Sequence, residues 1–261
     1  MIFRCCSAPC LYEGKKMICF ENVTYAYPGE KPVLKDLSFT ISKGERVGLI
    51  GANGAGKSTV MKAALGLVNC EGKISIDGME MCRRNLSAIR KCVGYVLQDS
   101  DNQMFMPTVF EDMIFGPMNY GMSREEAERS VDEILDELEL GYLKHRQNHK
   151  ISGGEKRMAA IATILAMKPE YMLMDEPSTA LDPQNRRKLI STLNKLPVTK
   201  IIATHDLDMV LETCDRVILL HHGRKHEGEQ DARKLLRGEL FGKGVRTDLG
   251  IVAQHAAQSV Q

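Results

Sequence analysis

The segment that most constrains this chain is the glycine-rich run GANGAGKST, Gly51–Thr59. It matches the pattern G-x-x-x-x-G-K-[ST], in which backbone N–H groups of a turn converge on phosphate oxygens at the start of a helix. The run RVGLI, residues 46–50, predicts a buried strand before the loop, and VMKAALGL, residues 60–67, predicts a helix after it. This order of strand, turn and helix predicts a site for a nucleoside triphosphate.

Two side chains of this loop have specific expected tasks. Lys57 is expected to reach the β- and γ-phosphates, and the Ser58 hydroxyl is expected to bind Mg²⁺. The loop residues expected to bind the nucleotide are Gly51, Asn53, Gly54, Gly56, Lys57, Ser58 and Thr59.

The run YMLMDEP, residues 171–177, is a hydrophobic strand that ends in two acids. Such an end places Asp175 where the sheet meets the phosphate loop, so we expect it to help hold Mg²⁺. The next residue, Glu176, is expected to polarise the attacking water as a general base. The two motifs together predict an enzyme that hydrolyses the triphosphate.

Four further motifs follow in a fixed order, and with them the chain resembles the nucleotide-binding subunits of ABC transporters. ISGGE, residues 151–155, resembles the LSGGQ signature, with Ile and Glu in place of its first and last residues. STALD, residues 178–182, resembles the D-loop, while Gln98 and His205 stand where the family has its Q-loop and switch histidine. The resemblance runs from about residue 18 to about residue 228.

The resemblance implies an α/β fold: a P-loop NTPase with a RecA-like core, an antiparallel β-subdomain and an inserted helical subdomain. It divides the chain into an N-terminal extension (1–16), an ABC ATPase domain (17–228) and a C-terminal tail (229–261). The helical subdomain lies within the ATPase domain, at about 101–165. Met1 and Met17 are both candidates for the native start. The patterning predicts strands at 18–27, 37–41, 73–78 and 200–204 and helices at 123–140, 189–196 and 233–240.

The family motifs also imply roles for single residues. Tyr27 matches the aromatic that stacks on adenine, and we favour it over Tyr25. Gln98 would bind Mg²⁺ together with Ser58 and Asp175, and His205 would hold the γ-phosphate. The predicted catalytic residues are Glu176, His205 and Lys57, and the predicted cofactors are ATP and Mg²⁺.

The signature motif lies far along the chain from the phosphate loop. In the family these two motifs lie at opposite ends of a subunit, so Ser152, Gly153 and Gly154 would contact ATP held by a second subunit. The resemblance therefore implies a dimer, and because every key position is filled we favour a homodimer over a heterodimer.

Residues 95–122 resemble the segment after the Q-loop in energy-coupling-factor transporters, which import cobalt, nickel or vitamins. The resemblance implies an ATPase that powers such an importer, bound to membrane-embedded subunits at the cytoplasmic face of the cell membrane. The alternatives are the ATPase of another ABC transporter and a soluble ABC ATPase that transports nothing. The separation of about 90 residues between loop and signature, without a sustained heptad pattern, argues against the DNA-repair type.

Composition excludes several other functions. A net charge of +1 gives no electrostatic reason to expect nucleic acid as a partner. No apolar run approaches the roughly 18–20 residues that span a bilayer, so the chain requires membrane partners for transport. Eight scattered cysteines without a secretory signal predict reduced thiols in a cytosol.

Three groups of residues have competing interpretations. Cys5, Cys6 and Cys10 lie close in sequence, but no fourth ligand at zinc spacing follows them. The histidines at 221, 222 and 226 are interpreted as an exposed turn rather than a metal site. The methionines of the helical subdomain predict either core packing or a groove for a partner helix, and for Met104, Met106 and Met113 both remain open.

Overall fold

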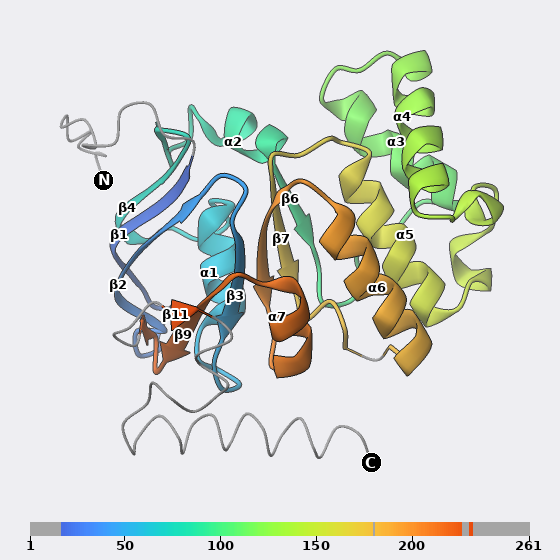
Figure 1. Ribbon diagram of the computed structural model, residues 1–261. Coiled ribbons are helices and arrows are strands. Elements are labelled where there is room, and N and C mark those ends of the chain that lie inside the picture. Colours follow the sequence, from blue (N-terminus) through green and yellow to red (C-terminus); the bar gives the residue numbers. More distant parts are fainter. Residues whose placement is uncertain (1–16, 180, 226–229, 232–261) are drawn as a thin grey trace.

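A computed structural model describes residues 17–179, 181–225 and 230–231, which form two β-sheets and a set of helices (Figure 1). The first sheet is antiparallel in the order β2-β1-β4-β5. Its strands are β1 (Met17–Tyr25), β2 (Leu34–Ser42), β4 (Glu71–Ile76) and β5 (Met79–Glu80). Strand β1 ends two residues before Tyr27, and β2 begins earlier than predicted because Leu34 already packs in the core of this sheet.

The second sheet, in the described part of the chain, has the order β10-β9-β3-β8-β7-β6, with β11 also pairing with β9. Strands β9, β3, β8, β7 and β6 run parallel to one another. The strands are β3 (Arg46–Ile50), β6 (Val93–Val96), β7 (Tyr171–Asp175), β8 (Thr199–Ala203), β9 (Arg216–His221), β10 (Arg224–Lys225) and β11 (Gln230–Asp231). Every residue of β7 and β8 is buried, as expected of parallel strands that helices cover on both faces.

The helices cover the parallel sheet and extend beyond it as a separate group around α3 and α4 (Figure 1). They are α1 (Lys57–Ala64), α2 (Leu86–Cys92), α3 (Val109–Asn119), α4 (Arg124–Glu137), α5 (Gly153–Leu165), α6 (Pro183–Lys195), α7 (Leu207–Thr213) and the short helices η1 (Gly141–Leu143) and η2 (Asn148–Lys150). The predicted α/β fold class, with one antiparallel and one mainly parallel sheet, is confirmed.

Helix α4 shows how the sequence specifies an element here. Ser123 caps it, and a reciprocal capping box with Glu126 pairs two N–H groups that would otherwise lack partners. Ala127 and Val131, spaced four residues apart on one face of the helix, are fully buried, so this face packs into the core. Helix α6 begins at Pro183, six residues before the predicted start at 189, because Asp182 caps it.

The methionines of the helical region divide between core and surface. Met104 and Met113 are buried, which confirms the core interpretation for both. Met106 is half-buried, and Met118 is 41% exposed. Core packing therefore accounts for two of the three methionines that the sequence left open.

Several predictions concern residues outside the described ranges. Cys5, Cys6, Cys10, the histidine at 226 and the helix predicted at 233–240 all belong to this group. In the ranges that the structure describes, no three histidine, cysteine, aspartate or glutamate side chains are grouped so that they could hold a metal ion. Likewise, no described helix combines the length and the apolar character needed to cross a membrane.

Lys200 is a buried amine in β8 and supplies a prediction about stability. Burial, reinforced by the charge of Arg46, lowers its pKa to about 8, below the value of about 10.4 expected in the unfolded chain. Between these two values the unfolded chain binds a proton that the folded protein does not, so this residue makes the free energy of unfolding rise as pH increases from about 8 to about 10.4.

Relative to Lys200→Met, the wild-type protein should therefore gain roughly 1–3 kcal/mol of stability across that pH range. Urea unfolding of both proteins at pH 7 and pH 10 measures the difference. The variant lacks the hydrogen bond from Lys200 Nζ to the Leu196 carbonyl (2.6 Å). Because that bond is missing at both pH values, its loss does not account for a difference between them. Stability curves that stay parallel would show that Lys200 keeps its usual pKa.

Candidate functional site

A cavity of about 440 Å³ opens where the glycine-rich loop meets the end of β7. The loop between β3 and α1 forms one wall, the segment after β1 forms another, and the residues that follow β6 and end β7 complete it. The lining residues are Tyr27, Glu30, Val33, Asn53, Gly54, Gly56, Lys57, Ser58, Thr59, Gln98, Asp175 and Glu176. Segments distant in sequence thus meet at one end of the parallel sheet, where α/β proteins bind ligands.

The loop holds its glycines in conformations and contacts that other residues would not tolerate. Gly56, the residue before α1, has φ of 105°. A Cβ atom at Gly51 would lie 2.5 Å from the Leu220 carbonyl oxygen, so the loop crosses directly over β9. A Cβ at Gly56 would lie 3.2 Å from the Val33 carbonyl oxygen, which places the start of β2 against the loop.

Lys57 lies at the floor of the cavity and is 7% exposed. Its Nζ donates to the Gly51 carbonyl at 2.8 Å and to the Ala52 carbonyl at 3.4 Å, and it lies 3.9 Å from a carboxylate oxygen of Glu176. Burial lowers the pKa of Lys57, while the charges of Glu176 and Asp175 oppose that shift. A cation held this way is suited to binding phosphate oxygens.

Glu176 follows β7 with φ of 45°, a left-handed backbone conformation that is uncommon for a residue with a side chain. Its Oε2 accepts from the Thr204 hydroxyl at 3.1 Å and lies 2.9 Å from His205 Nδ1. The two predicted catalytic residues after β7 and β8 therefore meet directly. Thr204 is a contact that sequence reasoning missed, although its position immediately before His205 is the signal that could have suggested it.

Asp175 is the last residue of β7, and its two oxygens differ. Oδ2 accepts from the Tyr95 hydroxyl at 3.3 Å, whereas Oδ1 is buried and has no hydrogen-bond partner among the described residues. A buried carboxylate oxygen without a partner is costly, and a divalent cation is the partner that such an oxygen prefers. With Ser58 and Gln98 on the same cavity, these oxygen donors suit the magnesium that the sequence predicts.

The two tyrosine candidates for the adenine site are in different positions. Tyr27 lines the cavity, and its hydroxyl lies 3.4 Å from the Thr59 hydroxyl. Tyr25 instead packs against the core of the antiparallel sheet, and its ring meets Tyr27 edge-on at 5.0 Å. This arrangement favours Tyr27 as the ring available to a nucleotide base.

The signature motif is separate from this cavity. Ser152 caps α5 and forms a capping box with Glu155, and neither Ser152 nor the glycines after it line the cavity. Gly153 has open space where a Cβ would be, but a Cβ at Gly154 would lie 2.4 Å from the Asn185 amide nitrogen. Gly154 thus permits α5 to pack on α6, a role independent of any contact with nucleotide.

The structure therefore brings together most of the predicted site. The loop, Gln98 and the two acids after β7 line one cavity, and His205 joins them through Glu176. Ser152, Gly153 and Gly154 do not line the cavity, and neither does Gly51, whose carbonyl instead accepts a hydrogen bond from Lys57. The fold and this site define a P-loop protein that binds a nucleoside triphosphate.

Comparison with known proteins identifies the family. The model of the ABC transporter family matches residues 34–179. A relative from Geobacter sulfurreducens, named "Putative ABC transporter ATP-binding protein", is 44% identical over 78% of this chain and 82% of its own length. The energy-coupling factor transporter ATP-binding protein EcfA of Methanothermobacter thermautotrophicus is 41% identical over 79% of this chain and 68% of its own.

Solved structures agree with the sequence comparison. CbiO1 of Clostridium perfringens, described as part of the ABC transporter complex CbiONQ, has a TM-score of 0.78 and 31% identity over 86% of this chain and 92% of that one. The ATP-binding cassette MJ0796, solved as a dimer in a post-hydrolysis state with ADP and Pi, has a TM-score of 0.73 and 30% identity, covering 83% and 99% of the two chains. This chain belongs to the ATP-binding proteins of the ABC transporter family, which bind ATP with Mg²⁺ and hydrolyse it.

Proposed function

We propose that this chain is the ATP-hydrolysing subunit of a membrane importer of the energy-coupling-factor type, with cobalt or nickel ions or a vitamin as its cargo. The observation that carries the ATPase role is that the phosphate loop, Gln98, Asp175 and Glu176 line the same cavity. The resemblance of residues 95–122 to energy-coupling-factor ATPases supports the importer type, as does the similarity to EcfA and CbiO1.

Within the proposed site, each residue acts on the triphosphate or on water. Lys57 binds the β- and γ-phosphates, and Tyr27 stacks on adenine. Glu176 orients or deprotonates the attacking water, and its contacts with Thr204 and His205 hold the carboxylate in place. Ser58, Gln98 and Asp175 would hold Mg²⁺, which when bound neutralises charge on the phosphate oxygens.

We propose that the active form is a head-to-tail dimer. Ser152 and Gly153 are exposed and do not line the cavity of their own subunit. In the proposed dimer they contact ATP held by the other subunit, so ATP links the two copies. Loss of the γ-phosphate removes part of that link, and the dimer then opens because only the closed form makes those contacts.

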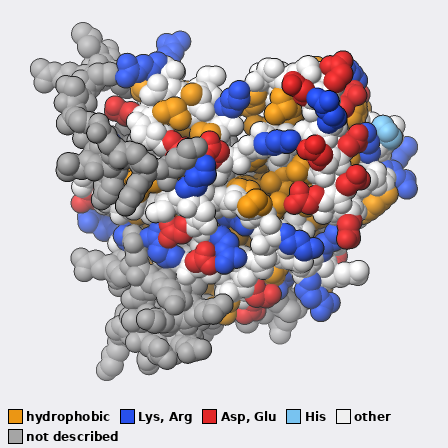
Figure 2. All heavy atoms as spheres, turned by 45° about the horizontal axis from the view of Figure 1, so that its top comes forward, with side chains coloured by type: hydrophobic (Ala, Val, Ile, Leu, Met, Phe, Trp, Pro, Cys, Tyr) orange, Lys and Arg blue, Asp and Glu red, His pale blue; other side chains and the backbone are white. Residues whose placement is uncertain are grey.

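The proposed membrane partner binds the face that carries α3 and α4. Figure 2 shows hydrophobic side chains exposed on this face among charged side chains of both signs. Phe105 is 64% exposed, Phe115 is 40% exposed, and their rings pack edge-on at 5.1 Å. Exposed aromatic pairs of this kind are typical of protein interfaces.

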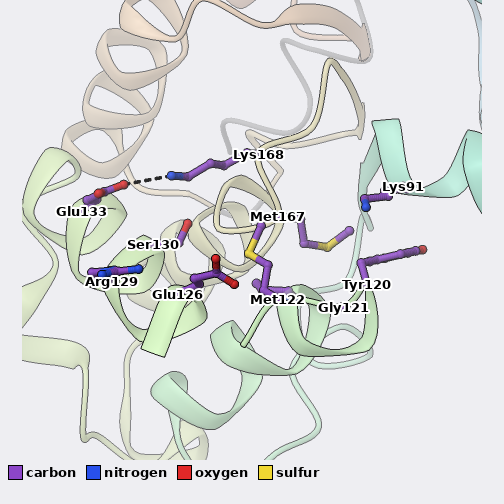
Figure 3. Close-up of a pocket in the computed structure, with 11 residues that line it drawn as sticks. Lys91, Tyr120, Gly121, Met122, Glu126, Arg129, Ser130, Glu133, Met167 and Lys168 are labelled. Atoms are coloured by element: carbon purple, nitrogen blue, oxygen red, sulfur yellow. Dashed lines mark hydrogen bonds and ion pairs between the residues drawn. The ribbon is translucent and has the colours of Figure 1, made fainter. Parts of the chain in front are cut away.

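A groove of about 420 Å³ lies on the same helical region (Figure 3). The end of α3, one side of α4 and the segment after α5 form its walls, with Tyr120, Met122, Arg129 and Met167 among the lining residues. Adaptable methionines next to a basic side chain suit a helix from a membrane subunit. The proposed location is accordingly the cytoplasmic face of the cell membrane, as a peripheral subunit.

Affinity purification from membranes of the source cell tests this proposal. The expected result is that the tagged chain co-purifies with a small integral scaffold protein and with a substrate-binding membrane protein, whose sequence would then name the cargo. Recovery of a two-domain permease without such a substrate-binding protein would contradict the importer type while leaving the ATPase role. Recovery of ribosomes or DNA-repair proteins alone would contradict any transport role.

A further inference from the structure

Arg157 is a buried cation that the ATPase mechanism above does not use. It lies in α5, two residues after the signature motif, and is 4% exposed. Its guanidinium donates to two backbone carbonyls of one segment, to Leu97 at 2.6 Å and to Gln98 by a second short hydrogen bond. The segment that carries Gln98 is thereby tied to the helix that begins at the signature.

Gln103 makes a second connection between the same two parts. Its side-chain oxygen accepts from the Leu97 N–H at 3.0 Å, and its side-chain nitrogen donates to the Ala160 carbonyl at 2.7 Å. The main chain between Leu97 and Gln103 thus has both ends fixed to α5. A third contact, the ion pair of Lys156 with Asp101, crosses the outside of the same junction.

The buried charge of Arg157 is unfavourable unless hydrogen bonds compensate for it, so its bonds to the backbone at Leu97 and Gln98 are structurally important. Burial lowers the pKa of its guanidinium because the charged form is removed from water. The guanidinium donates hydrogen bonds to two backbone carbonyls. Hydrogen bonds from a charged donor are stronger than those between neutral groups. Removing the guanidinium would leave the Leu97 and Gln98 carbonyls without that donor.

We infer that Arg157, assisted by Gln103, is a positioning residue that holds Gln98 at the nucleotide cavity and makes the segment 97–103 move as one body with α5. This inference rests on the proposed role of Gln98 as a ligand of Mg²⁺. Arg157 itself touches neither ATP nor metal. Its contacts fix the backbone from which the Gln98 side chain reaches the cavity.

Two readouts in the full-length protein test the inference without measuring turnover. The first is hydrogen–deuterium exchange in peptides that cover residues 97–103. The second is the Mg²⁺ concentration that gives half-maximal binding of a fluorescent ATP analogue. The affinity for the same analogue without Mg²⁺ is measured for comparison. The variants are Arg157→Met, which removes the donors, and Arg157→Lys, which keeps the charge but loses the paired geometry.

In Arg157→Met, exchange at 97–103 should accelerate roughly tenfold, and the Mg²⁺ requirement should rise roughly tenfold, because one or two charge-assisted bonds are lost. Binding without Mg²⁺ should stay within about twofold of wild type, since the loop residues that contact phosphate are unchanged. Arg157→Lys should restore part of both effects. Arg124→Met, which removes an exposed arginine paired with Glu128 on α4, is the matched control and should change neither.

Gln103→Glu keeps the acceptor for the Leu97 N–H but cannot donate to the Ala160 carbonyl. It should shift both readouts in the same direction as Arg157→Met, and it carries the test if that variant does not fold. Wild-type exchange at 97–103 in folded variants would overturn the inference. The inference would also be overturned if these variants needed no more Mg²⁺ than wild type while Gln98→Ala needed more. A wild-type requirement in Gln98→Ala itself would instead contradict the proposed role of Gln98.

Discussion

Replacing Glu176 by Gln is expected to leave ATP binding intact and to reduce ATP hydrolysis by a factor of about 10²–10⁴, the range for loss of a general base. The amide has the same shape as the carboxylate, and its oxygen can still accept the hydrogen bond that the Thr204 hydroxyl donates to Glu176 at 3.1 Å. It cannot take a proton from water. Because bound ATP would persist, the variant should accumulate as an ATP-linked dimer.

Phosphate release measures the first effect, and size-exclusion chromatography with light scattering in the presence of ATP measures the second. Glu128→Gln, the same change on the exposed side of α4, is the matched control and should behave as wild type. Rapid hydrolysis by Glu176→Gln would remove Glu176 from the catalytic role. A variant that stops hydrolysing but stays monomeric with ATP would contradict the proposed dimer and leave the catalytic assignment in place.

Replacing Lys57 by Ala is expected to weaken ATP binding by a factor of about 10² or more. Each charge-assisted hydrogen bond to phosphate contributes about 1.5–3 kcal/mol, and Lys57 is placed to make such bonds. The change also removes the donor to the Gly51 carbonyl and the cation 3.9 Å from Glu176. The loop should therefore lose both its phosphate ligand and part of its own support.

Titration with a fluorescent ATP analogue measures this loss of affinity. Lys195→Ala, at the exposed end of α6, removes a lysine that has no part in the cavity and serves as control. Circular dichroism establishes that the Lys57 variant is folded before its affinity is compared. Unchanged affinity in the folded variant would refute the assignment of the phosphate loop.

Local patterns accounted for much of the fold and the cavity. The loop between a buried strand and a helix, and the acids that end β7, need only short-range sequence to be recognised, and the structure places them together. The position of Gln98 and His205 came from family resemblance rather than from spacing. These two residues lie near the loop because strands β6 and β8 flank β7 in the sheet. Local sequence patterns do not predict that strand order.

Other features depend on tertiary packing and could not be read from one sequence. Arg157 appears in the sequence as one cation among many, and only its burial beside Leu97 and Gln98 distinguishes it. Gly154 could be matched to the signature, but its contact with Asn185 depends on how α5 meets α6. The run ALDPQNRRKLI places a proline near a helix start, and α6 does begin at Pro183, although the apolar pattern alone predicted a helix only from 189.

The close approach of β2 to the phosphate loop has a consequence for how a nucleotide is recognised. The Val33 carbonyl lies against Gly56, and the Tyr27 hydroxyl lies 3.4 Å from that of Thr59. The aromatic ring and the phosphate cradle are therefore held at a set separation before any ligand arrives. A ligand that spans that separation binds without a large loss of protein conformational entropy, whereas one of another length must deform two sheets that are already packed together.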